Sequence, residues 1–278
     1  MRKKLLAYLL IAFVLLSTLY GCRAAHPPKI LIAIDPGHGG PLDRDKGYKT
    51  LDGTYECIIN RAVALYLEEE LIKRGYDVIF TKDPDIEVHK QLEYRSYYAN
   101  EKNADLFISI HHDSNGDKKA SGFWVFYSSY KVHIDSDGII VVYNGNEYDL
   151  VSEENLPDYT IKTVTDGTKT FTINSSESLY KVIDTTPCDA AIESKKLAHK
   201  VFASMEKLSH IKPRGSADRY VVDEEYRVLR CADMPSILIE AGFMSNPKDS
   251  QSIMIDVNQK ALAIAIADGI DAYYAEKN

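Results

Sequence analysis

The sequence predicts an α/β fold, with a single domain whose mostly parallel sheet is flanked by helices, plus an inserted β-rich subdomain. Apolar runs of strand length alternate with segments of helical periodicity along most of the 278 residues, as is typical of helices packed on a parallel sheet. Between residues 131 and 189 the alternation stops, and β-favouring residues and turn dipeptides replace it. We therefore expect one domain over 29–278, interrupted by an insertion over 131–189.

The first strand and the first helix are clearly marked. Lys29–Asp35 is an apolar run that ends at Pro36-Gly37, the pattern of a central strand buried on both faces. After a glycine-rich polar stretch, a helix is predicted over about Glu56–Arg74, and Gly75 stands where a glycine commonly ends a helix. The apolar residues of this helix repeat at helical spacing: Ile59, Val63, Leu67 and Leu71.

The later elements follow the same alternation. We expect further strands over 76–81, 105–110, 122–127, 226–230 and 236–240, and further helices over 92–102, 194–208 and 259–274. The insertion contains three dipeptides that favour tight turns, which are Asp137-Gly138, Asn144-Gly145 and Asp166-Gly167. These dipeptides predict one or two β-hairpins in the insertion.

The N-terminal residues predict export. Three cations at positions 2–4 precede an apolar run over 5–16, which is too short to span a bilayer and fits the core of a secretory signal. The run ends at Leu19-Tyr20-Gly21-Cys22, which resembles the bacterial lipobox. We expect a signal peptide over 1–21 and a protein of the cell envelope, anchored in the membrane through lipidated Cys22. Cleavage a few residues later and an uncleaved anchor are the alternatives.

Charge and cysteine content exclude some classes of function. Loss of the leader would lower the formal net charge from −8 to −11. Nucleic acid is therefore not an expected partner, because binding it relies on clustered Lys and Arg. After Cys22, an odd number of cysteines remains, and no CxxC pair suggests a thiolate zinc site. We expect these thiols to be unpaired, with a disulfide between Cys188 and Cys231 as the alternative.

Four candidate functional residues stand at the boundaries of predicted elements. His38 follows the first strand, His111 ends the strand at 105–110, and Glu240 ends the strand at 236–240, while Glu56 begins the first helix. Sites in open α/β sheets form beyond the carboxyl ends of the strands. Two histidines and a carboxylate are a common ligand set for catalytic zinc, and a further carboxylate can accept a proton from water.

Each candidate also has a structural alternative when it is considered singly. A histidine can cap a turn or bond a backbone carbonyl, and Glu56 would suit the dipole of a helix N-terminus. Glu240 is harder to explain in this way, because a carboxylate directly after Ile-Leu-Ile is costly to bury without a cation or a donor.

Three motifs resemble those of the amidase-3 family of N-acetylmuramoyl-L-alanine amidases. They are Ile-Asp-Pro-Gly-His-Gly-Gly at 34–40, Ser-Ile-His at 109–111, and Pro-Ser-Ile-Leu-Ile-Glu-Ala-Gly-Phe-Met-Ser-Asn-Pro at 235–247. Arg95 and Asn100 fit the family's segment between the second and third strands. The resemblance spans about 30–128 and 193–275, in the same order along the chain.

The resemblance implies a fold, a cofactor and an activity. The fold would contain a mixed sheet of about six strands flanked by helices. Residues that match His38, Glu56 and His111 would bind Zn²⁺, and the residue that matches Glu240 would be the catalytic carboxylate. The activity would be hydrolysis of the amide bond between N-acetylmuramic acid and L-alanine in bacterial peptidoglycan.

The sequence departs from the family after His111, where His112 and Asp113 replace a small residue and an asparagine. Because side chains alternate along a strand, His112 should point away from the metal. Asp113 would either orient a ligand histidine or face solvent.

Three rival functions and an open question accompany the resemblance. One rival is the same hydrolysis on a peptide amide outside the cell wall, which the export signal disfavours. Another is a non-catalytic or autoinhibited wall-binding lipoprotein that retains the fold. The third is a cysteine hydrolase that uses Cys57, which is disfavoured because the adjacent Glu56 would raise the thiol pKa. The insertion over 131–189 matches nothing in the family core. It would shape or occlude the substrate groove, bind a protein activator or regulator, or be neutral.

Overall fold

The computed structural model describes residues 29–40, 45–86, 88–134, 138–176 and 179–277. The expected signal peptide and Cys22 lie outside these residues. Within them, no helix combines the length and the apolar character needed to cross a membrane.

A six-stranded mixed sheet forms the centre of the domain, in the order β10-β4-β11-β3-β1-β2. The strands are β1 (Leu31–Pro36), β2 (Asp77–Phe80), β3 (Leu106–Asp113), β4 (Trp124–Tyr127), β10 (Val221–Asp223) and β11 (Ser236–Phe243). Strands β2, β1, β3 and β11 are parallel, whereas β4 runs antiparallel to β11 and parallel to β10. The α/β fold predicted from the sequence is confirmed.

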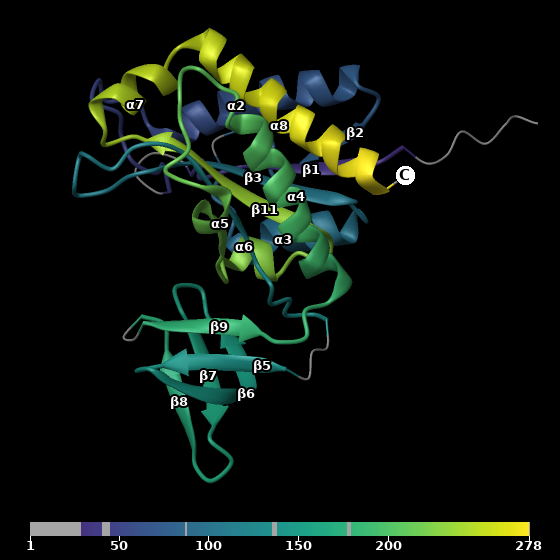
Figure 1. Cartoon of the computed structure of the whole chain (residues 1–278), viewed down its shortest axis with the longest axis vertical. Helices are drawn as coiled ribbons and strands as arrows, with labels where there is room; N and C mark the ends of the chain where they lie inside the picture. The colour runs from purple at the N-terminus through teal and green to yellow at the C-terminus, as the bar shows by residue number, and fades with distance from the viewer. Residues whose placement is uncertain (1–28, 41–44, 87, 135–137, 177–178, 278) are drawn as a thin grey trace, which may run out of the picture. The chain divides into compact units, whose positions relative to one another are not determined.

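Helices cover both faces of this sheet (Figure 1). One face carries α2 (Glu56–Lys73), α4 (Asp189–Met205) and α8 (Asp256–Lys277), of which α8 contacts both of the others. The other face carries α3 (Leu92–Glu101) and α6 (Arg227–Arg230). The core on this second side combines residues of the sheet with residues of these two helices, among them Ala33, Phe107, Leu238, Ala99 and Leu229. Alternation along the strands therefore aims Asp35, Ser109, His111 and Glu240 toward the α3 and α6 side.

One predicted strand is wrong. Within residues 226–230, Arg227–Arg230 form the short helix α6, and the sixth strand is β10. Val228, Leu229 and Arg230 are all buried, because Arg230 bonds to the insertion while its two neighbours pack on the sheet. Two short helices, α5 (Ala217–Tyr220) and α7 (Pro247–Ile253), were not predicted.

The insertion contains a second sheet of five antiparallel strands, in the order β8-β7-β6-β5-β9. Its strands are β5 (Ile139–Tyr143), β6 (Asn146–Asn155), β7 (Thr160–Thr165), β8 (Thr170–Asn174) and β9 (Tyr180–Asp184). The predicted turn between β5 and β6 has positive φ at both Asn144 (51°) and Gly145 (78°), as tight hairpin turns require. One face of this sheet buries Tyr130, Val141, Val164, Ile173 and Val182. The insertion is therefore more extensive than one or two hairpins.

The insertion joins the domain at the amino ends of the parallel strands. Because β4 is antiparallel to β11, its last residue Tyr127 lies toward the beginning of β11. Beyond it, the buried Lys131 donates to Ser236 Oγ at 2.7 Å and to the carbonyl oxygen of Leu229 at 2.8 Å. His111 and Glu240 stand at the opposite, carboxyl ends of the same strands.

Buried charges hold the insertion against α6. Lys162, on β7, has a fully buried side chain and forms ion pairs with Glu153 and with Glu225, the latter at 2.9 Å. Arg230 forms an ion pair with Glu153, and it donates to Asn155 Oδ1 at 2.6 Å. Each buried charge thus has an opposite charge beside it, which burial requires.

Candidate metal centre

The loop after β1 brings His38 to the carboxyl edge of the sheet in an uncommon backbone conformation. His38 has φ of 62° and Gly39 has φ of 112°, a region that non-glycine residues rarely occupy. Gly37 donates to the carbonyl oxygen of Ile110 at 2.9 Å. A Cβ at Gly37 would lie 2.3 Å from His111 Nε2, so only glycine lets this loop lie against the His111 ring.

His38, Glu56 and His111 converge at this edge. His38 Nε2 lies 3.1 Å from Glu56 Oε2, and His111 Nδ1 lies 3.2 Å from Glu56 Oε1. One candidate ligand atom from each residue lies within 4.8 Å of the other two. The structure therefore brings together the three residues that the sequence proposed as ligands, in a group that could hold a metal ion.

Electrostatics couple the three side chains. Burial would lower the pKa of His38, but hydrogen bonds with Asp45 and Glu56 outweigh it and raise that pKa to about 9. Burial would likewise raise the pKa of Glu56, but hydrogen bonds from His111 and His38 hold it well below its usual range. Glu56 is therefore an anion between two histidine rings.

A polar network behind His38 orients its ring. His38 Nδ1 lies 2.7 Å from Asp45 Oδ1, and Arg95 Nη2 donates to Asp45 Oδ2 at 3.2 Å. Arg95 is itself buried and also donates to Asp35 Oδ1 at 3.0 Å. Carboxylates that bond the second nitrogen of a ligand histidine fix its tautomer and direction.

Asn60 and His112 support Glu56 from the α2 side. Asn60 Nδ2 donates to Glu56 Oε1 and to the carbonyl oxygen of Gly37, both at 3.2 Å. Asn60 Oδ1 lies 2.7 Å from His112 Nδ1. His112 stands outside the His38, Glu56 and His111 group, and burial lowers its pKa to about 4. It is therefore a neutral, buried histidine.

Glu240 lies beside this group. It pairs with His111 across β11 and β3 and with Trp124 across β11 and β4. Its side chain is half-buried, and its Oε2 atom is buried without a hydrogen-bond partner among the described residues. Burial, followed by the charges of Glu56 and Asp113, raises its pKa well above the usual range. Such a carboxyl group holds a proton more readily than an exposed one does.

Sequence reasoning missed two residues of this arrangement, Asp45 and Asn60. Asn60 stands four residues after Glu56, which places both on one face of α2, so the helical spacing offered a signal. Asp45 lies in a polar loop, and nothing in the sequence distinguishes it from the other acidic residues there. Asp113, whose role was open, accepts a hydrogen bond from its neighbour Ser114 at 2.6 Å.

The cysteines take no part in the candidate metal centre. Cys188 and Cys231 form no disulfide, and burial raises the pKa of the Cys231 thiol to about 11.

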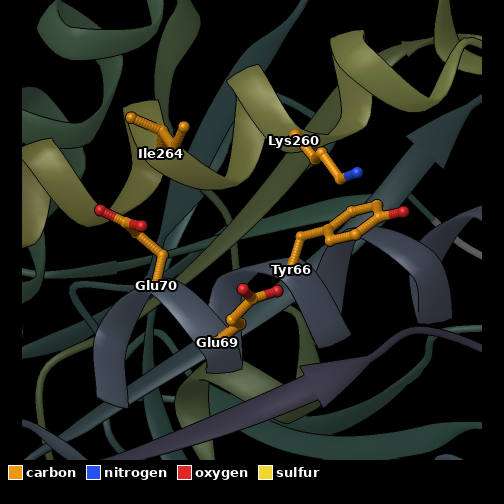
Figure 2. Close-up of a pocket in the computed structure, with 5 residues that line it drawn as sticks. All are labelled: Tyr66, Glu69, Glu70, Lys260 and Ile264. Carbon is orange, nitrogen blue, oxygen red and sulfur yellow. The ribbon is translucent and has the colours of Figure 1, made fainter. Parts of the chain in front are cut away.

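A cavity of about 140 Å³ lies between α2 and α8. Figure 2 shows the residues that line it, which are Tyr66, Glu69, Glu70, Lys260 and Ile264. Glu70 is ion-paired with Arg74 at 2.7 Å, and Lys260 with Asp256 at 2.9 Å. None of the candidate site residues lines this cavity.

The sequence matches one family profile over most of its length. The profile described as N-acetylmuramoyl-L-alanine amidase (Amidase_3) matches residues 32–272. The chain is 28% identical over 251 residues to the N-acetylmuramoyl-L-alanine amidase AmiC of Neisseria meningitidis, which covers 90% of this chain and 54% of that protein. It is 27% identical to the uncharacterized protein YqiI of Bacillus subtilis, with 92% of each chain covered. The chain spans about half the length of the AmiC proteins it matches.

Solved structures share the fold. An N-acetylmuramoyl-L-alanine amidase from Clostridium difficile 630 aligns with a TM-score of 0.62 at 24% identity, over 90% of this chain and 99% of that one. The CwlD amidase from Clostridioides difficile, solved in complex with the GerS lipoprotein, aligns with a TM-score of 0.57 at 22% identity. That alignment covers 89% of this chain and 99% of the CwlD chain.

Proposed function

The chain belongs to the N-acetylmuramoyl-L-alanine amidase family, and from this membership we propose that it is a zinc-dependent peptidoglycan amidase. The bond hydrolysed is the amide between the lactyl group of N-acetylmuramic acid and L-alanine of the stem peptide. The observation that carries the proposal is the convergence of His38, Glu56 and His111, with Glu240 beside them.

The donor set fits zinc. Two imidazole nitrogens and one carboxylate are a common protein ligand set for catalytic zinc, in which a fourth position stays open. His38, Glu56 and His111 would be the ligands, with Asp45 and Asn60 orienting them. When bound, zinc supplies a Lewis acid that activates water and polarises a carbonyl group.

Glu240 is the group that moves protons in this proposal. Its buried Oε2 has no hydrogen-bond partner among the described residues, and a water molecule or a substrate group would supply the missing partner. In its ionised form Glu240 accepts a proton from the attacking water, and its raised pKa favours holding that proton until it passes to the nitrogen of L-alanine as the amide bond breaks. The products are a muramoyl lactyl carboxylate and a stem peptide with a free amino terminus.

The proposal also covers the cellular location of the protein and the extent of its catalytic domain. We place the protein in the cell envelope, exported by a signal peptide over 1–21 and anchored through lipidated Cys22. The catalytic domain covers 29–278, and 131–189 is an insertion that serves as a docking site for a protein regulator. The CwlD amidase was solved with a lipoprotein bound, which supports the idea of a regulatory partner on this fold.

The direct test is digestion of purified peptidoglycan, followed by mass analysis of the released ends. We expect free L-alanine amino termini, and we expect a chelator to abolish them and added zinc to restore them. The Glu240→Ala variant should bind zinc as the wild type does and lose at least about 100-fold in turnover. Normal turnover in this variant would refute the role of Glu240. A wild type that binds the wall and releases no ends would favour the non-catalytic alternative.

A further inference from the structure

Lys82 extends the line of functional residues along the carboxyl edge of the sheet. It follows β2 just as His38 follows β1, and β1 and β2 are parallel neighbours. Its side chain is only 7% exposed, and within the described part of the chain it makes no hydrogen bond or ion pair. The described part of the chain gives this cation no hydrogen bond or ion pair in return for burying most of its side chain, so packing alone does not explain a lysine at this position.

The Lys82 ammonium lies against the loop that carries His38. A Cβ at Gly39 would stand 2.5 Å from Lys82 Nζ and 3.2 Å from its Cε. The absence of a side chain at Gly39 thus makes room for the ammonium one residue after a proposed zinc ligand. A substrate held at the metal centre could therefore reach Lys82 within a short segment of its own chain.

A cavity of about 240 Å³ adjoins this ammonium. It is enclosed by the loop after His38, the first turns of α2 and the loop after β2, with Gly39, Ile58, Arg61, Lys82 and Ile86 in its lining. Arg61 is already neutralised, since it forms an ion pair with Asp85 and donates to the carbonyl oxygen of Pro84 at 2.6 Å. Lys82 is thus the cation in the described lining that remains available to an anion.

We propose that Lys82 and this cavity bind a carboxylate of the stem peptide, close to the scissile amide. The inference rests on the proposed function, because it takes the substrate to be a muramoyl peptide. The amino sugars of the glycan carry no carboxylate besides the lactyl group that is cleaved, whereas the stem peptide carries free carboxylates. A cation on this side of the metal centre therefore selects the peptide part of the substrate.

The electrostatic surroundings agree with an anionic ligand. Burial, together with the neighbouring Arg95 cation, lowers the pKa of Lys82. A carboxylate that enters the cavity would offset the effect of burial and of Arg95 on the ammonium charge. It would also form a charge-assisted hydrogen bond with the ammonium. An uncharged carboxamide in the same place would leave the cation unpaired. Lys82 would thus distinguish stem peptides whose second residue is D-glutamate from those in which it is D-isoglutamine.

The test compares muramoyl-L-alanyl-D-glutamate with its D-isoglutamine analogue, both with the γ-carboxyl group blocked as an amide, so that they differ only in α-carboxylate against α-carboxamide. We expect the wild type to prefer the carboxylate by about tenfold or more in kcat/KM. The Lys82→Met variant should lose this preference through a higher KM for the carboxylate substrate, with little change for the analogue. Its Tm should not fall, because methionine keeps most of the side-chain packing and the lysine charge has no ion-pair partner among the described residues. Lys90→Met removes a lysine from the neighbouring cavity and should keep the preference.

Two outcomes would overturn the role of Lys82. One is an unchanged preference in Lys82→Met, and the other is an equal loss for both substrates together with a lower Tm, which would mark a structural lysine. Calorimetric binding of the dipeptides L-alanyl-D-glutamate and L-alanyl-D-isoglutamine, again with the γ-carboxyl group amidated, tests the Lys82 subsite independently of the proposed hydrolysis. If the wild type cleaves neither muramoyl peptide, the proposed function fails. A carboxylate preference in dipeptide binding that Lys82→Met abolishes would still support the subsite, and its absence would refute it.

Discussion

Asn60 connects the main parts of the candidate metal centre through one side chain. It is fully buried, donates to Glu56 and to the loop that carries His38, and lies against His112. Its amide therefore sets the position of a proposed ligand carboxylate relative to a proposed ligand histidine. Residues that orient metal ligands in this way contribute to metal affinity without contacting the ion.

Asn60→Ala should lower zinc affinity by about 10- to 100-fold, because Glu56 loses a donor and the His38 loop loses its tie to α2. The measurement is competition for zinc with a chelator of known affinity. Asn100→Ala is a matched control, since Asn100 also bonds backbone groups, at Cys231 and Asp233, away from the metal centre. If the two variants lose zinc affinity equally, Asn60 has no specific role at the centre.

At the scale of elements, the contact between α6 and strands β6 and β7 depends on buried charge. Arg230 has a side chain that is 2% exposed, and Glu153 one that is 5% exposed. Lys162 completes the group from β7. Removing one member leaves an opposite charge buried without compensation, which costs far more than the loss of a surface ion pair.

Arg230→Met should therefore destabilise the protein by about 3–5 kcal/mol, measured by urea unfolding. The control is Lys260→Met, which removes one partner of an exposed i,i+4 pair with Asp256 and should cost no more than about 0.5 kcal/mol. Similar losses for the two variants would show that the buried group does not hold the insertion in place.

At the scale of the whole molecule, the insertion joins one end of the six-stranded sheet and the candidate metal centre lies at the opposite end. The chain enters the insertion beside the first residue of β11, at Ser236, whereas Glu240 and His111 lie at the other end. An insertion attached there is better placed to bind a partner than to cover the metal centre. This location argues against occlusion of the site by residues 131–189.

Replacing residues 135–186 by a short flexible linker should leave zinc affinity and turnover of soluble muramoyl peptides within about threefold of the wild type. The variant also needs Arg230→Met and Glu225→Gln, because both residues lose ion-pair partners in the insertion. Turnover that rises many-fold after the deletion would show autoinhibition, and turnover that disappears would show that the insertion completes the site.

Local patterns in the sequence predict the order and type of most elements, and they identify the four candidate site residues. Apolar periodicity reports which face of a segment is buried, and parallel strands bring their carboxyl ends to one edge. Those two facts are enough to place His38, His111 and Glu240 near one another. The motifs add Glu56, whose helix begins where the loop returns to the sheet.

The pairing of distant segments is a property of the folded chain. Local patterns do not state which strand will be a neighbour, so the antiparallel direction of β4 and the joining of five insertion strands into one sheet could not be predicted. The helix at Arg227–Arg230 was missed because its buried arginine depends on Glu153, far away in the chain. The same reason applies to Asp45 and Lys82: a polar residue in a loop acquires its role from the groups that folding brings to it.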